Sequence, residues 1–344
     1  MVPRRSRSTK KLKPSERSRF LNLRALRRLY DSRVQIGLSP YKPYSVPLKS
    51  SSTIAQAPQG GEFPNRDGYD VDFLGPDLAL PKLSPELQKQ AAPLLADPSQ
   101  TELKYTHFSV VMHKMRRLPI LTAVNINGAE LRSVPRNDRW VTDDRMSRDY
   151  QLGNEAYTNN DLDRGHMVRR LDPVWGEKAE QANADTFVYT NCALQHKDLN
   201  RKEWVALEEH ILDNARTTDR KMTVLTGPVF SHKDPIFDNG GRVTPPTHIP
   251  QQFWKVAVWN NGENALEGTA FVLSQAELID TEDYRDGKFD PGRFDVYQIP
   301  MEQLKKMTQL DFGNIADVAP GGKKLETASD MDLGPATLNP QDRP

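Results

Sequence analysis

The sequence predicts an α+β protein with one compact domain of roughly 220 residues between long ends that lack regular structure. Three observations support this prediction. The 344 residues could form two average domains, but charged and Pro-rich stretches occupy the ends of the chain. The middle contains several short apolar runs typical of strands. It also contains one long segment of strong helix formers without Gly or Pro.

The two ends differ in charge. Residues 1–100 are predicted to be a basic arm and a linker, largely disordered, and residues 313–344 a disordered polar tail. In residues 1–33 twelve basic residues stand against two acidic ones, so the arm carries +10 and the rest of the chain −9. Residues 16–31 fit a basic amphipathic helix, as in a targeting peptide, a membrane-surface anchor or a nucleic-acid arm. A solvated, disordered tail is the alternative. Residues 38–70 have the Pro, Ser and Gly content of a linker.

The folded domain is predicted at residues 101–312, with compact structure starting near Tyr105. Apolar runs bounded by turn residues predict strands. These runs are 108–112, 121–128, 222–226, 252–259 and 268–273. The second should end in a turn at Asn127-Gly128, and the third should be closed by Gly227-Pro228.

The composition also bears on compartment and partners. Cys192 is the only cysteine, which excludes an intrachain disulfide and favours a reducing compartment. No apolar run approaches the ~18 residues needed to span a bilayer, and the arm lacks the apolar stretch of a signal peptide. We therefore expect a soluble, cytoplasmic protein, with mitochondrial targeting through the basic N-terminus as the alternative. Since the body is acidic, affinity for phosphate must reside in the arm or in a local cleft.

The tetrapeptide Asp163-Arg164-Gly165-His166 is the first candidate for chemistry. A given tetrapeptide occurs by chance on the order of twice per thousand chains of this length. Imidazole is available in its neutral form near pH 7, so His166 suits a general base that activates water. A histidine taken alone is more often a packed or surface residue, and the neighbouring motif residues favour catalysis here.

A helix is predicted over residues 200–212, with Asn200, Trp204 and Glu208 on one face. An amide oxygen in the first turn can bind a hard cation directly and leave the other positions to water and phosphate, as Mg²⁺ prefers. Glu208 is then placed to hold a water bound to that ion. The alternative makes Asn200 a helix cap and Glu208 a solvated side chain.

Arginines are the candidates for binding substrate phosphate, because a guanidinium matches the phosphate oxygens. Arg164 lies inside the motif, and Arg136 and Arg139 lie upstream. Asn191 follows an expected strand and can orient the histidine or a water, or serve as a turn residue that satisfies its own backbone. A base, a cation site and positive charge are what phosphodiester hydrolysis needs, so the sequence predicts a metal-dependent nuclease.

These motifs resemble the DNA/RNA non-specific endonucleases of the ββα-metal class, the endonuclease G-like nucleases. The matching residues, in order, are Asp163-Arg164-Gly165-His166, Thr190-Asn191 with Gln195, and Leu199-Asn200 with Trp204 and Leu207-Glu208. The resemblance extends over Phe108 to Leu310, because 226–230 and 253–256 look like later strands of that family. At 191–195 the chain lacks a Pro that many members have.

The resemblance implies a mixed or antiparallel sheet flanked by helices, with a strand–strand–helix element that holds the site. By it His166 is the general base, Asn200 the sole direct protein ligand of one Mg²⁺, and Glu208 a partner of the ion through water. Arg164 binds near the phosphate. The family's upstream arginine matches Arg139 loosely, with Arg136 in reserve.

The implied activity is hydrolysis of DNA and RNA to 5′-phosphate and 3′-hydroxyl ends with weak sequence preference, supported by one Mg²⁺ or Mn²⁺. Lys255, in the matching segment 253–256, is a further candidate for substrate binding. Two alternatives stay open: a phosphodiesterase acting on small phosphate esters, and a nucleic-acid or membrane-binding protein with a vestigial nuclease fold. An inhibitor or regulatory protein and a homodimer are further expectations.

Overall fold

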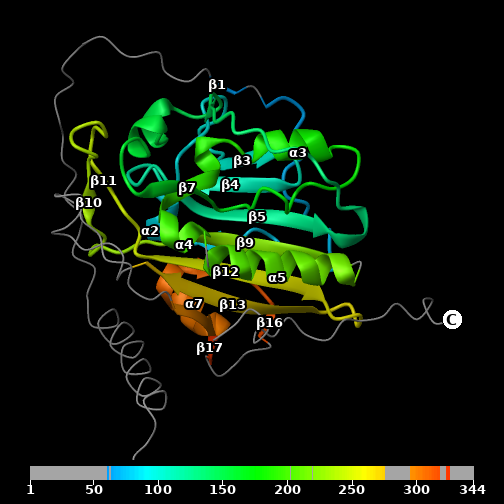
Figure 1. Ribbon diagram of the computed structural model, residues 1–344. Helices are drawn as coiled ribbons and strands as arrows, with labels where there is room; N and C mark the ends of the chain where they lie inside the picture. The colour runs from blue at the N-terminus through cyan, green and yellow to red at the C-terminus, as the bar shows by residue number, and fades with distance from the viewer. Residues whose placement is uncertain are drawn as a thin grey trace, which may run out of the picture. The chain divides into compact units, whose positions relative to one another are not determined.

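The computed structural model describes residues 60–61, 63–201, 203–218, 220–275, 295–317 and 323–325. Its centre is a nine-stranded sheet with helices packed against it (Figure 1). The basic helix expected at 16–31 and most of the linker expected at 38–70 lie outside the described residues. Among the described residues, no helix has the length and apolar character needed to cross a membrane.

The central sheet is almost entirely antiparallel. Its strands are β3 (Glu102–Tyr105), β4 (Phe108–Met112), β5 (Pro119–Asn127), β9 (Lys221–Val229), β12 (Gln252–Asn260), β13 (Leu266–Ser274), β14 (Asp295–Ile299), β16 (Ala316–Asp317) and β17 (Lys323–Leu325). The order is β17-β14-β13-β12-β9-β5-β4-β3, with β16 beside β13. Only the described pairing of β13 with β16 is parallel. The predicted α+β class with a mixed sheet is confirmed.

The middle strands are buried on both faces, which explains their continuous apolar runs. Every residue of β4 and β5 is buried, and β9 and β12 each have a single residue that is not. Helix α5 (Glu203–Thr217) crosses one face of this sheet (Figure 1). Its Trp204 packs edge-on against Phe253 of β12, with 5.9 Å between ring centroids. Burial of such aromatic side chains fixes α5 against the sheet.

A smaller sheet carries the tetrapeptide motif. Strand β7 (Leu162–His166) pairs antiparallel with β8 (Cys192–His196), so that His166 lies opposite Cys192. Helix α4 (Lys197–Arg201) follows β8 directly, and α5 comes next. A Cβ at Gly165 would lie 1.9 Å from Oε1 of the buried Gln195, so this position requires glycine. Together β7, β8 and the helices form the expected strand–strand–helix element.

Shorter elements connect these two sheets. The helices are α2 (Pro85–Gln88), α3 (Ala179–Asp185) and α7 (Met301–Thr308), with 3₁₀ turns η1 (Gly128–Glu130), η2 (Arg148–Tyr150), η3 (Asn154–Ala156) and η4 (Tyr189–Asn191). The short strand pairs are β1 (Gly60–Gly61) with β6 (Thr142–Asp143), β2 (Lys82–Leu83) with β15 (Leu310–Asp311), and β10 (Ile236–Phe237) with β11 (Thr247–His248).

The predicted boundaries at residues 101 and 313 are wrong. Packed structure begins before residue 101: Tyr69, Leu78 and Ala92 are buried, and the Tyr69 hydroxyl donates to the Leu78 carbonyl at 2.8 Å. Tertiary contacts rather than long helices or strands hold this segment, so its sequence shows no helix or strand periodicity. In the expected tail, β16 and β17 pair with β13 and β14.

The interior elements follow the prediction more closely. Strands β4, β5, β9, β12 and β13 confirm the five predicted runs. However, Gly227 and Pro228 do not end β9, since both continue its pairing with β12. The helix expected at 200–212 falls on α4 and α5, with residue 202 outside the described residues.

Candidate active site

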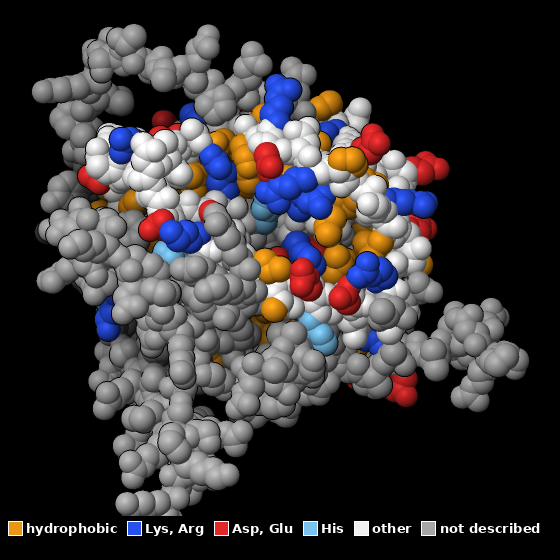
Figure 2. Space-filling view, in the orientation of Figure 1, with side chains coloured by type: hydrophobic (Ala, Val, Ile, Leu, Met, Phe, Trp, Pro, Cys, Tyr) orange, Lys and Arg blue, Asp and Glu red, His pale blue; other side chains and the backbone are white. Residues whose placement is uncertain are grey.

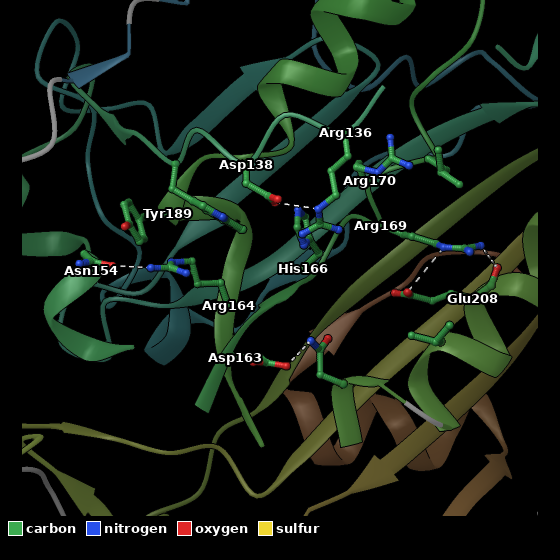
Figure 3. Close-up of a pocket in the computed structure, with 14 residues that line it drawn as sticks. Arg136, Asp138, Asn154, Asp163, Arg164, His166, Arg169, Arg170, Tyr189 and Glu208 are labelled. Carbon is green, nitrogen blue, oxygen red and sulfur yellow. Dashed lines mark hydrogen bonds and ion pairs between the residues drawn. The ribbon is translucent and has the colours of Figure 1, made fainter. Parts of the chain in front are cut away.

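A cleft of about 810 Å³ is lined by the end of β7, by segments 136–140 and 169–171, and by α4 and α5. Its size lies within the range of about 300–1,000 Å³ typical of ligand sites. The charged lining comprises four arginines and three carboxylates. On this face of the molecule Lys and Arg side chains gather between α3 and α5 (Figure 2), and Figure 3 shows the lining residues. The cleft therefore favours an anion.

His166, the last residue of β7, lines this cleft. Its ring centroid lies 4.9 Å from that of Trp140 and 5.4 Å from that of Phe187. Burial, and then the charges of Arg136 and Arg170, lower the pKa of His166 to about 3. The ring is therefore neutral at pH 7 and has a lone pair that can accept a proton. Its Nε2 is buried without a hydrogen-bond partner among the described residues, as expected of a group that meets water or substrate.

Asn200 of α4 lines the same cleft and is oriented by Asp163 of the motif. Asn200 Nδ2 donates to Asp163 Oδ2 at 3.1 Å. Because the carboxylate engages the amide nitrogen, the amide oxygen is left as the acceptor for a cation. The described residues contain no group of three or more His, Cys, Asp or Glu side chains arranged to hold a metal ion. An amide oxygen is a suitable ligand for a hard cation such as Mg²⁺, which keeps several waters in protein sites.

Arg164 is held against aromatic rings on one side of His166. Its guanidinium lies 5.6 Å from the ring centroid of Trp140 and 5.8 Å from that of Tyr189. It also donates to the side-chain oxygen of Asn154. These contacts fix the direction of the guanidinium without neutralising its charge, because none of these partners is an anion. Arg164 can therefore offer its full charge to a phosphate.

Glu208 joins the cleft to a buried charge cluster, which we define as Asp172, Arg169, Glu208 and Lys255. Lys255 Nζ lies 3.5 Å from Glu208 Oε1 and 3.0 Å from Thr226 Oγ1. Arg169 Nε lies 3.8 Å from Glu208 Oε2, and its NH1 donates to the Glu208 main-chain oxygen at 2.9 Å. Burial raises the pKa of Glu208 to about 7, against the opposing charge of Lys255, and raises the pKa of Asp172 to about 6.

Two predicted substrate contacts are wrong. Arg139 is exposed and lies outside the cleft lining, whereas Arg136 lines it and pairs with Asp138 at 2.7 Å. Lys255 does not face substrate, because it is 1% exposed and bonded within the buried charge cluster.

The predicted catalytic role of Asn191 is also corrected. Asn191 lies just before β8 rather than after a strand, and it is fully buried. Its amide accepts from Val168 N at 2.9 Å and donates to Val168 O at 3.0 Å and Thr186 O at 3.1 Å. It therefore touches neither His166 nor the cleft, and it positions the backbone that follows His166.

Sequence reasoning missed several residues of the site. Arg169 and Arg170 line the cleft, and Asp163 orients Asn200. Asp163 belongs to the tetrapeptide, and Arg169 and Arg170 follow closely in Met167-Val168-Arg169-Arg170. Their distance from His166 was short enough to suggest them. No local pattern in the sequence brings Trp140 to His166, because the two lie 26 positions apart, with other elements between them.

The geometry defines a class of protein. A strand–strand–helix element with histidine and arginine on its first strand, and asparagine on the following helix, is the arrangement of a ββα-metal nuclease. The chain belongs to the DNA/RNA non-specific endonuclease family, whose model matches residues 91–318.

The chain is also similar to individual proteins. A Sinorhizobium fredii protein of uncharacterised function is 34% identical over 292 residues, covering 78% of this chain and 43% of that protein. Human mitochondrial endonuclease G is 28% identical over 178 residues, covering 49% of this chain and 54% of that protein. The chain thus spans about half the length of these relatives. A chain in the crystal structure of the EndoG/EndoGI complex matches with a TM-score of 0.49 and 18% identity, covering 70% of this chain and 97% of that one.

Proposed function

We propose that this protein is a metal-dependent endonuclease that hydrolyses phosphodiester bonds of DNA and RNA without sequence preference. The observation that carries the proposal is the convergence of His166, Arg164 and Asn200 in one cleft. A base, a phosphate-binding cation and a metal ligand are the three groups that this hydrolysis requires.

His166 is the general base in this proposal. The neutral ring accepts a proton from the water that attacks phosphorus, and the resulting imidazolium is stabilised by the phosphate that it faces. A free-state pKa near 3 makes a weak base, but an anionic substrate opposes the charges of Arg136 and Arg170 that help to depress it. The proposed base therefore becomes stronger when substrate binds.

The residues present fit a divalent cation at Asn200. Its amide oxygen is the acceptor left after the bond to Asp163, and the carboxylate of Glu208 lines the same cleft. Mg²⁺ or Mn²⁺ bound there would supply positive charge for the leaving 3′ oxygen. Cleavage on that side of phosphorus gives 5′-phosphate and 3′-hydroxyl ends.

The substrate follows from the kind of contact that the cleft offers. Its arginines recognise phosphate, which DNA and RNA share, and phosphate contacts carry no sequence information. Binding should therefore weaken steeply with salt. The proposed compartment follows by analogy: the similar human protein is mitochondrial endonuclease G, which suits the expected targeting by the basic N-terminus.

The test is cleavage of supercoiled plasmid and of a structured RNA, with Mg²⁺, with Mn²⁺ and with EDTA. We expect both substrates to be degraded only with metal, and His166→Ala to lower turnover by about 10²–10⁴-fold, the usual contribution of a general base. Substantial turnover by His166→Ala would remove His166 as the base. Hydrolysis of a chromogenic diester without plasmid cleavage would favour a small-ester phosphodiesterase, and nucleic-acid binding without any hydrolysis would favour a binding protein.

A further inference from the structure

Four arginines line the cleft, but carboxylates neutralise only two of them. Arg136 and Arg169 each have a carboxylate partner, at 2.7 and 3.8 Å respectively. Arg164 and Arg170 have no ion pair with any described residue. Like charges confined in one cleft repel each other, and a bound anion offsets that repulsion. The cleft therefore presents two guanidiniums whose charge no described carboxylate neutralises.

Arg170 is built into the cleft rather than free in solvent. Its NH1 donates to the Val134 carbonyl at 3.1 Å and to Asn183 Oδ1 at 3.0 Å. Asn183 is buried in α3 and in turn donates to the Pro135 carbonyl at 3.2 Å. These bonds occupy one of the three guanidinium nitrogens, and the other two have no acceptor among the described residues. The remaining N–H groups form a fork of the kind that binds two phosphate oxygens.

The two unneutralised guanidiniums lie on opposite sides of His166. In Figure 3, Arg164 approaches from the side of Asn154 and Tyr189, and Arg170 lies beyond the ring beside Arg136. A single phosphate held next to His166 by Arg164 leaves the N–H groups of Arg170 without an anion. A polynucleotide strand supplies a second phosphate one nucleotide away.

We propose that Arg170, together with Arg136, binds the phosphate adjacent to the one that is cleaved. The substrate class is then an oligonucleotide with at least two consecutive phosphates, and an ester with one phosphate fills only half of the site. This inference rests on the proposed nuclease function and adds to it a reason for selecting polymers. Because the contact is to phosphate, it serves DNA and RNA alike.

The kinetic test compares a dinucleoside monophosphate, which has one phosphodiester, with a thymidine pentanucleotide. We expect Arg170→Gln to lower kcat/KM about tenfold on the pentanucleotide, the size of a charged hydrogen bond, and less than about twofold on the dinucleoside monophosphate. Arg170→Lys retains the charge and should recover part of the loss. Arg242→Gln is the matched control, since Arg242 is exposed and outside the cleft.

A binding measurement tests the same site without turnover. In the His166→Ala protein, the dependence of pentanucleotide affinity on KCl should lose about 0.7 from its log–log slope when Arg170 becomes Gln, the value for one phosphate contact on a single strand. Arg136→Gln gives a second readout that does not depend on the bonds of Arg170 to Val134 and Asn183. Thermal unfolding of each variant identifies any that fail to fold.

Some outcomes would overturn the inference. Equal losses on the short and long substrates, an unchanged salt slope, or equal effects of Arg170→Gln and Arg170→Lys would give Arg170 a purely structural role. Failure of the proposed function looks different, because wild-type protein would then cleave neither substrate with Mg²⁺ or Mn²⁺. In that case the salt slope in the His166→Ala protein still decides whether Arg170 binds phosphate.

Discussion

The open cleft around His166 and the buried charge cluster beneath Glu208 contain the same kinds of side chain but arrange them in opposite ways. In the cleft, Arg164 and Arg170 have no carboxylate partner among the described residues. In the buried charge cluster, every described charge has an opposite charge nearby, and Lys255 is 1% exposed. The difference teaches that burial demands an opposite charge nearby, whereas an arginine that faces the cleft can remain without a carboxylate partner.

The two regions differ in the free-energy cost of an unpaired charge, because only the cluster is buried. An ion pair removed from water is stable only while both partners are present, because a single buried charge loses its hydration without compensation. Lys255 reaches from β12 to Glu208 on α5, and Arg169 reaches the same residue from the segment after β7. The buried charge cluster thus joins the sheet, the helix and the motif strand that form the cleft.

The largest expected effect is on the buried charge cluster. Lys255→Met should destabilise the protein by about 3–5 kcal/mol, because it leaves Glu208 as a buried carboxylate without its lysine partner. The measurement is the free energy of unfolding from urea denaturation at pH 8. Since methionine matches the apolar part of lysine, the loss would report charge rather than volume.

Two variants complete this experiment. Lys233→Met removes an exposed lysine and should change stability by less than about 0.5 kcal/mol. The double variant Lys255→Met/Glu208→Gln should recover much of the loss, because neither charge then remains unpaired. A loss in the double variant equal to that of Lys255→Met alone would mean that packing, not pairing, dominates at this position.

The second prediction concerns Asn191, which holds the backbone behind His166. Asn191→Ala removes three hydrogen bonds to the buried main chain of Val168 and Thr186 and should cost about 3 kcal/mol. We also expect a fall in kcat with little change in KM, because the ring of His166 loses its support. Asn137→Ala, at an exposed asparagine, is the control. Full stability of Asn191→Ala would show that these bonds contribute nothing.

How well the fold could be predicted from the sequence depends on whether local or distant contacts hold each element. Runs such as Phe108–Met112 predict their strands correctly because burial on both faces makes them continuously apolar. Residues 63–100 gave no such signal, since hydrogen bonds to Ser109 and Leu78, rather than a helix or strand, hold Tyr69. Gly227 was taken as a strand end from its residue type. In β9 it instead allows close packing, because a Cβ there would lie 2.4 Å from the Ile120 carbonyl oxygen and 3.0 Å from the Trp254 ring.

The site was predictable where spacing along one element placed the residues. His166 and Asn200 were found because one motif and one helix carry them, whereas the pairing of Lys255 with Glu208 joins β12 to α5 and leaves no local pattern. Lys255 was expected to contact substrate and Asn191 to act in catalysis. Both side chains are buried, which the sequence does not state, and both stabilise the site instead. Arg139 is exposed, as Arg136 is, but only Arg136 lines the cleft.

The third prediction is a pH dependence within the buried charge cluster. The folded-state pKa of Glu208 is about 7, above its ordinary value of 4.5. Between these pH values the folded protein holds this proton and the unfolded chain does not, so stability falls as pH rises from 4.5 to 7. Relative to Glu208→Gln, wild-type protein should lose on the order of 2 kcal/mol across this window. Urea denaturation at several pH values measures the difference, and parallel curves would refute the assignment.

The smallest expected effect concerns the cleft. Its test compares two arginines that lie three residues apart in the sequence. Arg136→Gln should lower kcat/KM on plasmid about tenfold, because Arg136 lines the cleft, whereas Arg139→Gln should leave it within about twofold. Both side chains are exposed, so neither change should alter the free energy of unfolding by more than about 0.5 kcal/mol. The pair therefore isolates position in the cleft from charge and stability. A loss with Arg139→Gln alone would reverse the assignment and return the phosphate contact to the residue that the sequence first indicated.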